Sequence, residues 1–167
     1  MRKRFDWEGF KSEISGIRFE DGKEFVASRS KDYYWYSPIL DEIFRDKIGD
    51  LAVIPSNQEQ VQKVAAAIAK YKIPLTLRGG GTGNYGQCVP LEGGVIMIMT
   101  KLNRVIAFKE KSVLTESGVR ISRLDDAARK IGLELLMYPS TRLTATIGGF
   151  LAGGSGGCGS LRNGMLR

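Results

Sequence analysis

Histidine is absent from all 167 residues of the chain, and cysteine occurs only twice. Without histidine, this segment has no serine–histidine or cysteine–histidine catalysis, no histidine metal ligand and no cofactor attached through an imidazole. The two cysteines, Cys88 and Cys158, form neither a CxxC pair nor a disulfide framework. We therefore expect free thiols, a reducing compartment and no metal. Any chemistry must come from a bound group or from residues elsewhere.

Long apolar runs are also missing. The longest strongly apolar stretch, VIMIM at residues 95–99, is far shorter than the roughly 20 residues that span a bilayer. The cations at the N-terminus are followed by Asp6, Glu8 and Glu13 rather than by the apolar run of a secretory signal. We therefore expect no transmembrane segment and a location in the cytoplasm.

The charged residues include an excess of cations, which gives a formal net charge of +7. Cations and acids are interleaved, as in KSEISGIRFEDGKE, and this is more typical of a solvated surface than of a nucleic-acid interface. The excess nevertheless suits an anionic cofactor or substrate. The length and the 43% of hydrophobic residues predict one buried core.

The spacing of apolar residues predicts an α+β fold. We expect a helix at 6–14, a strand at 17–20, a helix at 39–48 and a strand at 51–54. Ser56-x-x-Glu59 is a capping box that opens a helix ending near residue 72. A second amphipathic helix is expected after Gly118. Further strands are predicted at 73–77, 95–99, 104–108, 113–116 and 133–137.

Three sets of side chains are predicted to be buried. Each amphipathic helix has one apolar stripe, and the aromatic residues of DYYWYSP, at 32–38, are expected in the core because aromatic clusters pack there more often than on binding surfaces. The stripes contain Val61, Val64, Ala65, Ile68 and Tyr71 in the first helix, and Leu124, Ala127, Ala128 and Ile131 in the second.

RGGGTGNYGQ, residues 78–87, is called here the first glycine segment, and it contains Gly81-x-Gly83-x-x-Gly86. This is the literal pattern of a Rossmann dinucleotide-binding turn, which must open a helix. Pro90 and the pair at 93–94 leave no room for that helix before the next strand, and no acid for a ribose lies between residues 93 and 109. A Walker A loop is excluded because no Gly-Lys-Ser/Thr follows. The fold is therefore not a Rossmann fold.

Five of the eight residues from Gly79 to Gly86 are glycine. Successive amides in such turns form an anion-binding concavity, although a flexible surface loop has the same composition. A second glycine segment, TIGGFLAGGSGGCGSLRNG at 146–164, favours binding because its apolar residues are unlike those of a linker. Two separated backbone-lined loops suit an extended ligand with central phosphates and a flat ring, such as FAD.

The chain resembles the FAD-binding domain of the vanillyl-alcohol oxidase and p-cresol methylhydroxylase type. The matching motifs are VIPSNQEQV, IPLTLRGGGTGNYGQCVPLEGGVIM, ESGV and PSTRLTATIGGFLAGGSGGCGSLRNG, while SRSKDYYWYSP is similar to bacterial glycolate and D-lactate dehydrogenase-like flavoproteins. The resemblance implies a mixed sheet flanked by helices. It also implies an N-terminal extension at 1–50 that packs on the first part of the FAD-binding domain at 51–167.

The resemblance assigns FAD-binding roles to three parts of the chain. The first glycine segment would wrap the pyrophosphate, the ESGV motif would lie near the adenosine, and the region from 139 to 160 would follow the pyrophosphate, ribityl chain and flavin ring. The implied residues are Arg78, Gly79, Gly80, Gly81, Thr82, Gly83, Asn84, Tyr85, Gly86, Gly118, Pro139, Ser140, Thr146, Gly148, Gly149, Gly153, Gly154, Ser155, Gly157, Cys158, Gly159 and Ser160.

The same resemblance implies noncovalent FAD. Thr82 stands where members with a histidyl flavin often have histidine, and Cys158 does not match the position of cysteinyl attachment. Members of the family continue past the equivalent of Arg167 into a substrate-binding domain. No catalytic residue is therefore assigned, and surface or structural roles are favoured for Arg142 and Arg162 over binding of a substrate carboxylate.

The function implied is the FAD-binding portion of an oxidoreductase that oxidises a 2-hydroxy acid or similar alcohol by hydride transfer to flavin. The chain alone is expected to be inactive, and its uncovered apolar face is expected to allow self-association. Three alternatives remain open at this point. One is a flavin domain like that of UDP-N-acetylenolpyruvoylglucosamine reductase, and another is a nonenzymatic nucleotide- or RNA-binding module. The third is a structural remnant, a folded core that has lost its ligand site.

Overall fold

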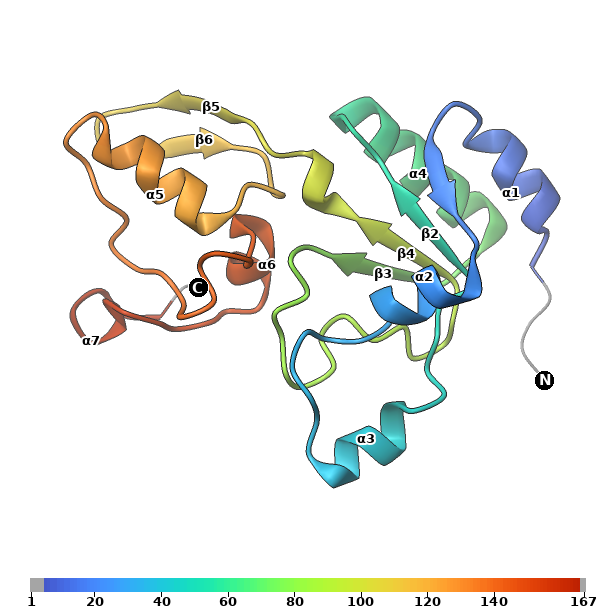
Figure 1. The fold of residues 1–167 in the computed structure, drawn as a ribbon. Coiled ribbons are helices and arrows are strands. Elements are labelled where there is room, and N and C mark those ends of the chain that lie inside the picture. Colours follow the sequence, from blue (N-terminus) through green and yellow to red (C-terminus); the bar gives the residue numbers. More distant parts are fainter. Residues whose placement is uncertain (1–4, 166–167) are drawn as a thin grey trace.

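A computed structural model describes residues 5–165 of the chain, and its main element is a four-stranded mixed sheet (Figure 1). The strand order is β1 (Arg18–Glu20), β2 (Leu51–Ile54), β4 (Val95–Ile98) and β3 (Leu75–Arg78). β2, β4 and β3 are parallel, and β1 pairs antiparallel with β2. The two central strands, β2 and β4, are buried along their whole length, as expected for strands covered on both faces.

Helices cover both faces of this sheet because alternate residues of each strand point to opposite sides. On one face, α1 (Trp7–Glu13) and α4 (Gln58–Tyr71) enclose a core with Leu51 and Val53 of β2. On the other face, α2 (Lys23–Arg29) packs Val26 against the alternate β2 residues, Ala52 and Ile54. The predicted α+β fold with a mixed sheet flanked by helices is confirmed.

The chain after β4 forms a second layer beside the sheet (Figure 1). A 3₁₀ turn, η1 (Met99–Lys101), leads from β4 to a hairpin of β5 (Val105–Phe108) and β6 (Val113–Thr115). The helices α5 (Ile121–Arg129), α6 (Ile147–Ala152) and α7 (Ser160–Asn163) follow. Ile121, Ala145 and Phe150 form a small core of their own.

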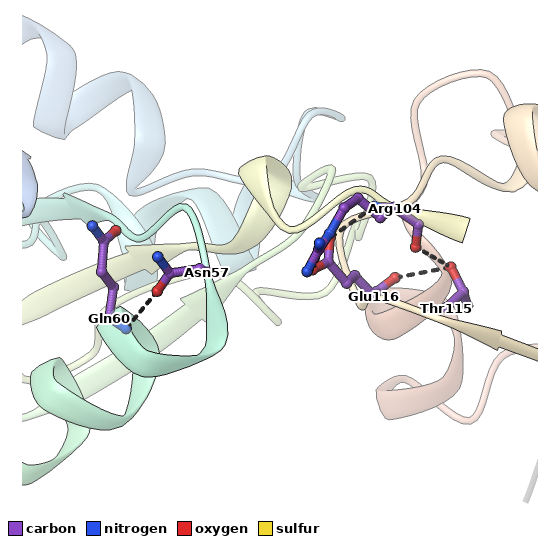
Figure 2. Close-up of polar contacts among 5 residues, drawn as sticks. All are labelled: Asn57, Gln60, Arg104, Thr115 and Glu116. Carbon is purple, nitrogen blue, oxygen red and sulfur yellow. Dashed lines mark hydrogen bonds and ion pairs between the residues drawn. The ribbon is translucent and has the colours of Figure 1, made fainter. Parts of the chain in front are cut away.

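Glu116 closes the base of the hairpin (Figure 2). Its Oε1 accepts hydrogen bonds from Arg104 Nε at 3.0 Å and Nη2 at 2.8 Å, and its Oε2 accepts from the Arg104 backbone N at 2.7 Å. The hydrogen bond from Arg104 lowers the pKa of Glu116. Thr115 Oγ1 also donates to the Arg104 carbonyl at 3.1 Å. These contacts fix the chain immediately before Gly118.

Several predicted details are wrong. The helix begins one residue later than the predicted capping box implies, because Asn57 Oδ1 accepts from Gln60 N at 2.8 Å (Figure 2). Gln60 Oε1 in turn accepts from Ser56 N at 2.8 Å. Ala65 and Ile131 are exposed rather than buried. The predicted strand at 133–137 is irregular chain, followed by a single bridge between Tyr138 and Cys158.

The prediction that the aromatic residues at 32–38 are buried is also wrong for most of them. Tyr33, Tyr34 and Trp35 are exposed, Trp35 by 93%, and only Tyr36 is half-buried. The neighbouring helix α3 (Pro38–Phe44) has no buried residue. The helix α2 was not anticipated either. The division of the chain at residue 50 stays a prediction, although α1, β1 and α2 contribute directly to the sheet and its two cores.

Candidate functional site

Three strands end at the same edge of the sheet, and a cleft of about 850 Å³ opens there. The last residues of the parallel strands β2, β3 and β4, which are Ile54, Arg78 and Ile98, all line it. Arg18 joins them because β1 runs antiparallel and pairs Arg18 with Ile54. The carboxyl edge of parallel strands is the usual place for a ligand in α/β sheets.

The two glycine segments meet in the wall of this cleft. Gly79 and Gly80 follow β3 and contact the chain that enters α6, which Figure 1 shows beside the end of β3. A Cβ on Gly79 would collide with Thr146 Oγ1, and a Cβ on Gly80 would collide with the Thr144 carbonyl oxygen. Glycine is therefore required on steric grounds at this junction.

Gly118 lies in the same wall for a similar reason. A Cβ there would collide with the Met99 carbonyl and lie 2.7 Å from the Leu102 carbonyl oxygen. Its amide donates to the Leu102 carbonyl at 2.8 Å, which holds the ESGV motif against the end of β4. Of the residues assigned to FAD by resemblance, five therefore line one cleft: Arg78, Gly79, Gly80, Gly118 and Thr146.

The cleft is strongly cationic. Among its described lining residues, six are cationic and one, Asp126, is acidic. Only Arg78 among these cations had been assigned to the site from the sequence. The others are Arg18, Arg29, Lys101, Arg120 and Arg123. They are scattered over more than 100 positions, so no local motif marks them, and the net charge of +7 was their only signal in the sequence.

Arg78 is more buried than a ligand-binding arginine need be, at 7% exposure. Its Nη1 donates to the carbonyl of Arg29 at 3.0 Å and to that of Lys31 at 2.5 Å. Burial lowers the pKa of its guanidinium. Gly81, at φ +66°, leaves room for this group, since a Cβ there would lie 2.9 Å from Arg78 Nε. The Nη1 group of Arg78 therefore has a structural role, because it joins the end of β3 to the backbone at Arg29 and Lys31.

The rest of the first glycine segment continues away from the lining residues. Thr82, Gly83, Asn84, Tyr85 and Gly86 are not among the described residues of the cleft wall. Asn84 and Tyr85 are exposed, and Gly86, at φ +89°, packs against the ring of Phe44. Their assigned contacts with FAD stay predictions.

Most of the second glycine segment forms a separate group. Cys158 N donates to the Tyr138 carbonyl at 2.9 Å, and Tyr138 N donates to the Cys158 carbonyl at 3.2 Å. This pairing places Pro139 and Ser140 next to the glycine run. Within the described chain, the cleft wall includes none of the assigned residues in this group, which are Pro139, Ser140, Gly148, Gly149, Gly153, Gly154, Ser155, Gly157, Cys158, Gly159 and Ser160.

The cleft fits an extended dinucleotide. Its volume lies within the range of about 300–1,000 Å³ for small-molecule sites. Glycine in its wall gives a ligand access to the backbone, and the surrounding cations favour a diphosphate.

Within residues 5–165, no helix is long and apolar enough to cross a bilayer.

Comparison with protein families decides which dinucleotide is bound. A model described as an FAD binding domain matches residues 49–167. The chain belongs to this FAD-binding family. FAD is therefore its cofactor, and the family predicted from the glycine motifs is confirmed.

Two curated relatives are FAD-family enzymes of greater length. A D-lactate dehydrogenase of Archaeoglobus fulgidus is 36% identical over 151 residues, which are 90% of this chain and 30% of that protein. The glycolate oxidase subunit GlcD of Escherichia coli strain K12 is 30% identical over 117 residues, which are 69% of this chain and 23% of that protein. The chain thus spans less than a third of the length of these relatives.

Solved structures of FAD-family proteins share the fold. An alkyldihydroxyacetonephosphate synthase superposes with a TM-score of 0.80 at 22% identity, over 96% of this chain and 34% of that one. A p-cresol methylhydroxylase superposes with a TM-score of 0.66 at 21% identity, over 83% of this chain and 27% of that one. The predicted fold of the p-cresol methylhydroxylase type, distinct from a Rossmann fold, is confirmed.

Proposed function

We propose that this chain is the FAD-binding portion of a flavin-dependent oxidoreductase that oxidises a 2-hydroxy acid and holds its flavin noncovalently. The observation that carries the proposal is the junction of the two glycine segments at Gly79 and Thr146, in the wall of a cationic cleft. D-lactate and glycolate, named in the two curated relatives, are both 2-hydroxy acids. This supports the substrate class.

The residues of the chain would bind and orient the cofactor. The backbone at Gly79 and Gly80 would face the diphosphate, and Arg120 and Arg123, at the start of α5, would balance its charge. The pair formed by Tyr138 and Cys158 would carry the second glycine segment towards the flavin ring. Bound FAD supplies the acceptor for a hydride from the substrate carbon.

The chain by itself is expected to be inactive in substrate oxidation. The two curated relatives are about three times as long as this chain, and no group on the described residues is assigned as the base that deprotonates a hydroxy acid. Turnover of D-lactate or glycolate by the purified chain with FAD and an artificial electron acceptor would contradict this expectation.

A titration of the purified chain with FAD tests cofactor binding, read by flavin fluorescence and absorbance. FMN, ADP and a short RNA are the comparison ligands. We expect saturable binding of FAD that survives moderate salt, and weaker binding of FMN. RNA binding that falls steeply with salt, without FAD binding in a folded chain, would contradict the proposal.

A charge variant tests whether the cleft is the binding site. Arg120→Gln with Arg123→Gln removes two cations from its wall. Arg45→Gln is the control outside the cleft: Arg45 is the C-cap of α3 and pairs with Asp41 at 3.5 Å. We expect the double variant to weaken FAD binding by tenfold or more, since the loss of even one hydrogen bond to a charged group costs about 1.5–3 kcal/mol. Arg45→Gln should bind FAD as the unaltered chain does.

We also infer that the chain self-associates and acts in the cytoplasm. Leu136, Leu143, Leu151 and Leu161 are exposed in the second layer, and such residues favour association. Sedimentation velocity over a range of protein concentrations tests the first inference, and a monomer throughout would contradict it. Fractionation of cells that express the native protein tests the second.

A further inference from the structure

The five residues 29–33, called here the upstream segment, touch the first glycine segment at its start, middle and end. At the start, Arg78 Nη1 donates to the Arg29 and Lys31 carbonyls. In the middle, Tyr33 N donates to the Gly81 carbonyl at 2.6 Å. The end is held by Asp32. The upstream segment lies outside residues 49–167, which the family model matches.

Asp32 uses both carboxylate oxygens on backbone amides of the loop. Oδ2 accepts from Gly86 N at 2.7 Å, and Oδ1 accepts from Cys88 N at 3.1 Å. The residue is only 7% exposed, so water does not readily replace either bond. Gly83 completes the contact, because a Cβ there would lie 3.2 Å from Asp32 Oδ2. The carboxylate thus holds the backbone at Gly86 and Cys88, with Gly83 packed closely against it.

Asp32 is itself positioned by the aromatic residues Tyr36 and Phe44. Its backbone N donates to the Tyr36 hydroxyl oxygen at 2.8 Å. The rings of Tyr36 and Phe44 meet edge to face at 5.2 Å between centroids. The ring of Phe44 also fills the space where Gly86 has no Cβ, since a Cβ there would lie 2.5 Å from Phe44 Cζ. The position of Asp32 therefore depends on the aromatic stretch at 32–36 and on α3.

We propose that Asp32 is a positioning residue for the cofactor, which fixes the first glycine segment in the conformation that receives the FAD diphosphate. The inference rests on the proposed function, which places the diphosphate against this segment. It extends the cofactor site beyond the matched family domain to residues 29–33 and to the side chains of Tyr36 and Phe44. Asp32 itself need not touch FAD.

Asp32→Asn tests the proposal with almost no change of shape. An asparagine has one side-chain oxygen, so one of the two amides, of Gly86 or Cys88, must face an NH₂ group instead of an acceptor. Asp50→Asn is the matched control. Asp50 Oδ2 accepts from Gly94 N at 2.7 Å in an equivalent contact between a carboxylate and a glycine amide, at the opposite edge of the sheet.

The first readout is amide hydrogen exchange in the ligand-free protein. In Asp32→Asn, exchange at Gly86 or at Cys88, whichever amide loses its acceptor, should be about tenfold faster, with Gly94 unchanged. In Asp50→Asn the remaining side-chain oxygen can still accept from Gly94 N, so any faster exchange should be confined to Gly94. A purely global loss of stability would raise exchange at all three amides in both variants. Unchanged protection of Gly86 and Cys88 in Asp32→Asn overturns the proposal.

The second readout is affinity for FAD and for ADP, which share the diphosphate. Asp32→Asn should weaken both by the same factor of about ten, while Asp50→Asn should stay within twofold of the unaltered chain. Unchanged affinity in a folded Asp32→Asn overturns the positioning role. If the unaltered chain fails to bind FAD, the proposed function is refuted. The exchange pattern then decides on its own whether Asp32 fixes the loop.

Discussion

Gly79 offers a direct test of how the two glycine segments fit together. It is not one of the positive-φ glycines, so alanine is compatible with its backbone. The added methyl group would collide with Thr146 Oγ1, whereas Thr146 Cβ lies 3.4 Å away, at ordinary contact distance. Gly79→Ala should therefore be harmful only because of the Thr146 hydroxyl. Removing that hydroxyl should restore the fit.

The expected magnitudes follow from these contacts. At an open site with compatible dihedrals, alanine in place of glycine stabilises by about 0.4–1 kcal/mol, whereas overpacking of a buried contact costs about 1–3 kcal/mol. We expect Gly79→Ala to lose about 1–2 kcal/mol of unfolding free energy. Thr146→Ala removes an N-cap bond to Gly149 N that is long, at 3.4 Å, so its cost should lie near the lower limit of about 0.5 kcal/mol.

The double variant distinguishes a steric cause from a general weakness of the loop. Gly79→Ala with Thr146→Ala should be more stable than the sum of the single effects by about 1–2 kcal/mol, because the colliding atom is gone. Thr146→Val keeps a branched side chain, so it should give no such rescue. Gly22→Ala is the control, since a Cβ there meets nothing within 4 Å and φ is −61°.

Urea unfolding followed by far-ultraviolet circular dichroism measures these differences, and equal slopes with denaturant ensure that the free energies are comparable. FAD affinity of the folded variants should follow the same order, with the Gly79→Ala single variant weakest. Additive effects in the double variant would refute the argument, and so would a Gly79→Ala chain as stable as the original.

Two further predictions concern titratable groups. At pH 7 a thiol reagent should label the exposed Cys158 and spare Cys88 until the chain unfolds, because burial raises the pKa of the Cys88 thiol to about 11; mass spectrometry of the labelled peptides checks this, and equal labelling rates would contradict it. Burial acts to raise the pKa of Asp125, but hydrogen bonds from Arg129 Nε at 2.9 Å and from Leu135 N lower it overall. Its stabilisation is therefore fully present above the ordinary aspartate pKa of about 4 and is lost as pH falls through the lowered native value. The stability difference between the original chain and Asp125→Asn, measured by urea unfolding, should shrink as pH is lowered from 5 to 3, and a constant difference would show that the charge of Asp125 contributes nothing.

The local motifs were sufficient to predict the type of fold and the cofactor family. The glycine spacing, read with the missing helix after Gly86, excluded a Rossmann turn. The apolar residues of TIGGFL, which are unlike those of a linker, favoured a second ligand-binding loop. These features depend on neighbours in the chain, since turn conformation, helix capping and apolar periodicity are properties of short segments.

The tertiary structure alone decided which of these residues share a cleft. The sheet order β1-β2-β4-β3 brings Arg18 and Arg78 to one edge, and the start of α5 adds Arg120 to the same cleft, although these residues are far apart in the sequence. In the folded chain Arg78 donates to the carbonyls of the upstream segment, Asp32 accepts from Gly86 N, and Trp35 is exposed. Composition and periodicity carry no information about strand order or long-range partners. The cationic wall of the cleft and the contacts of Asp32 with the first glycine segment therefore became visible only in the folded chain.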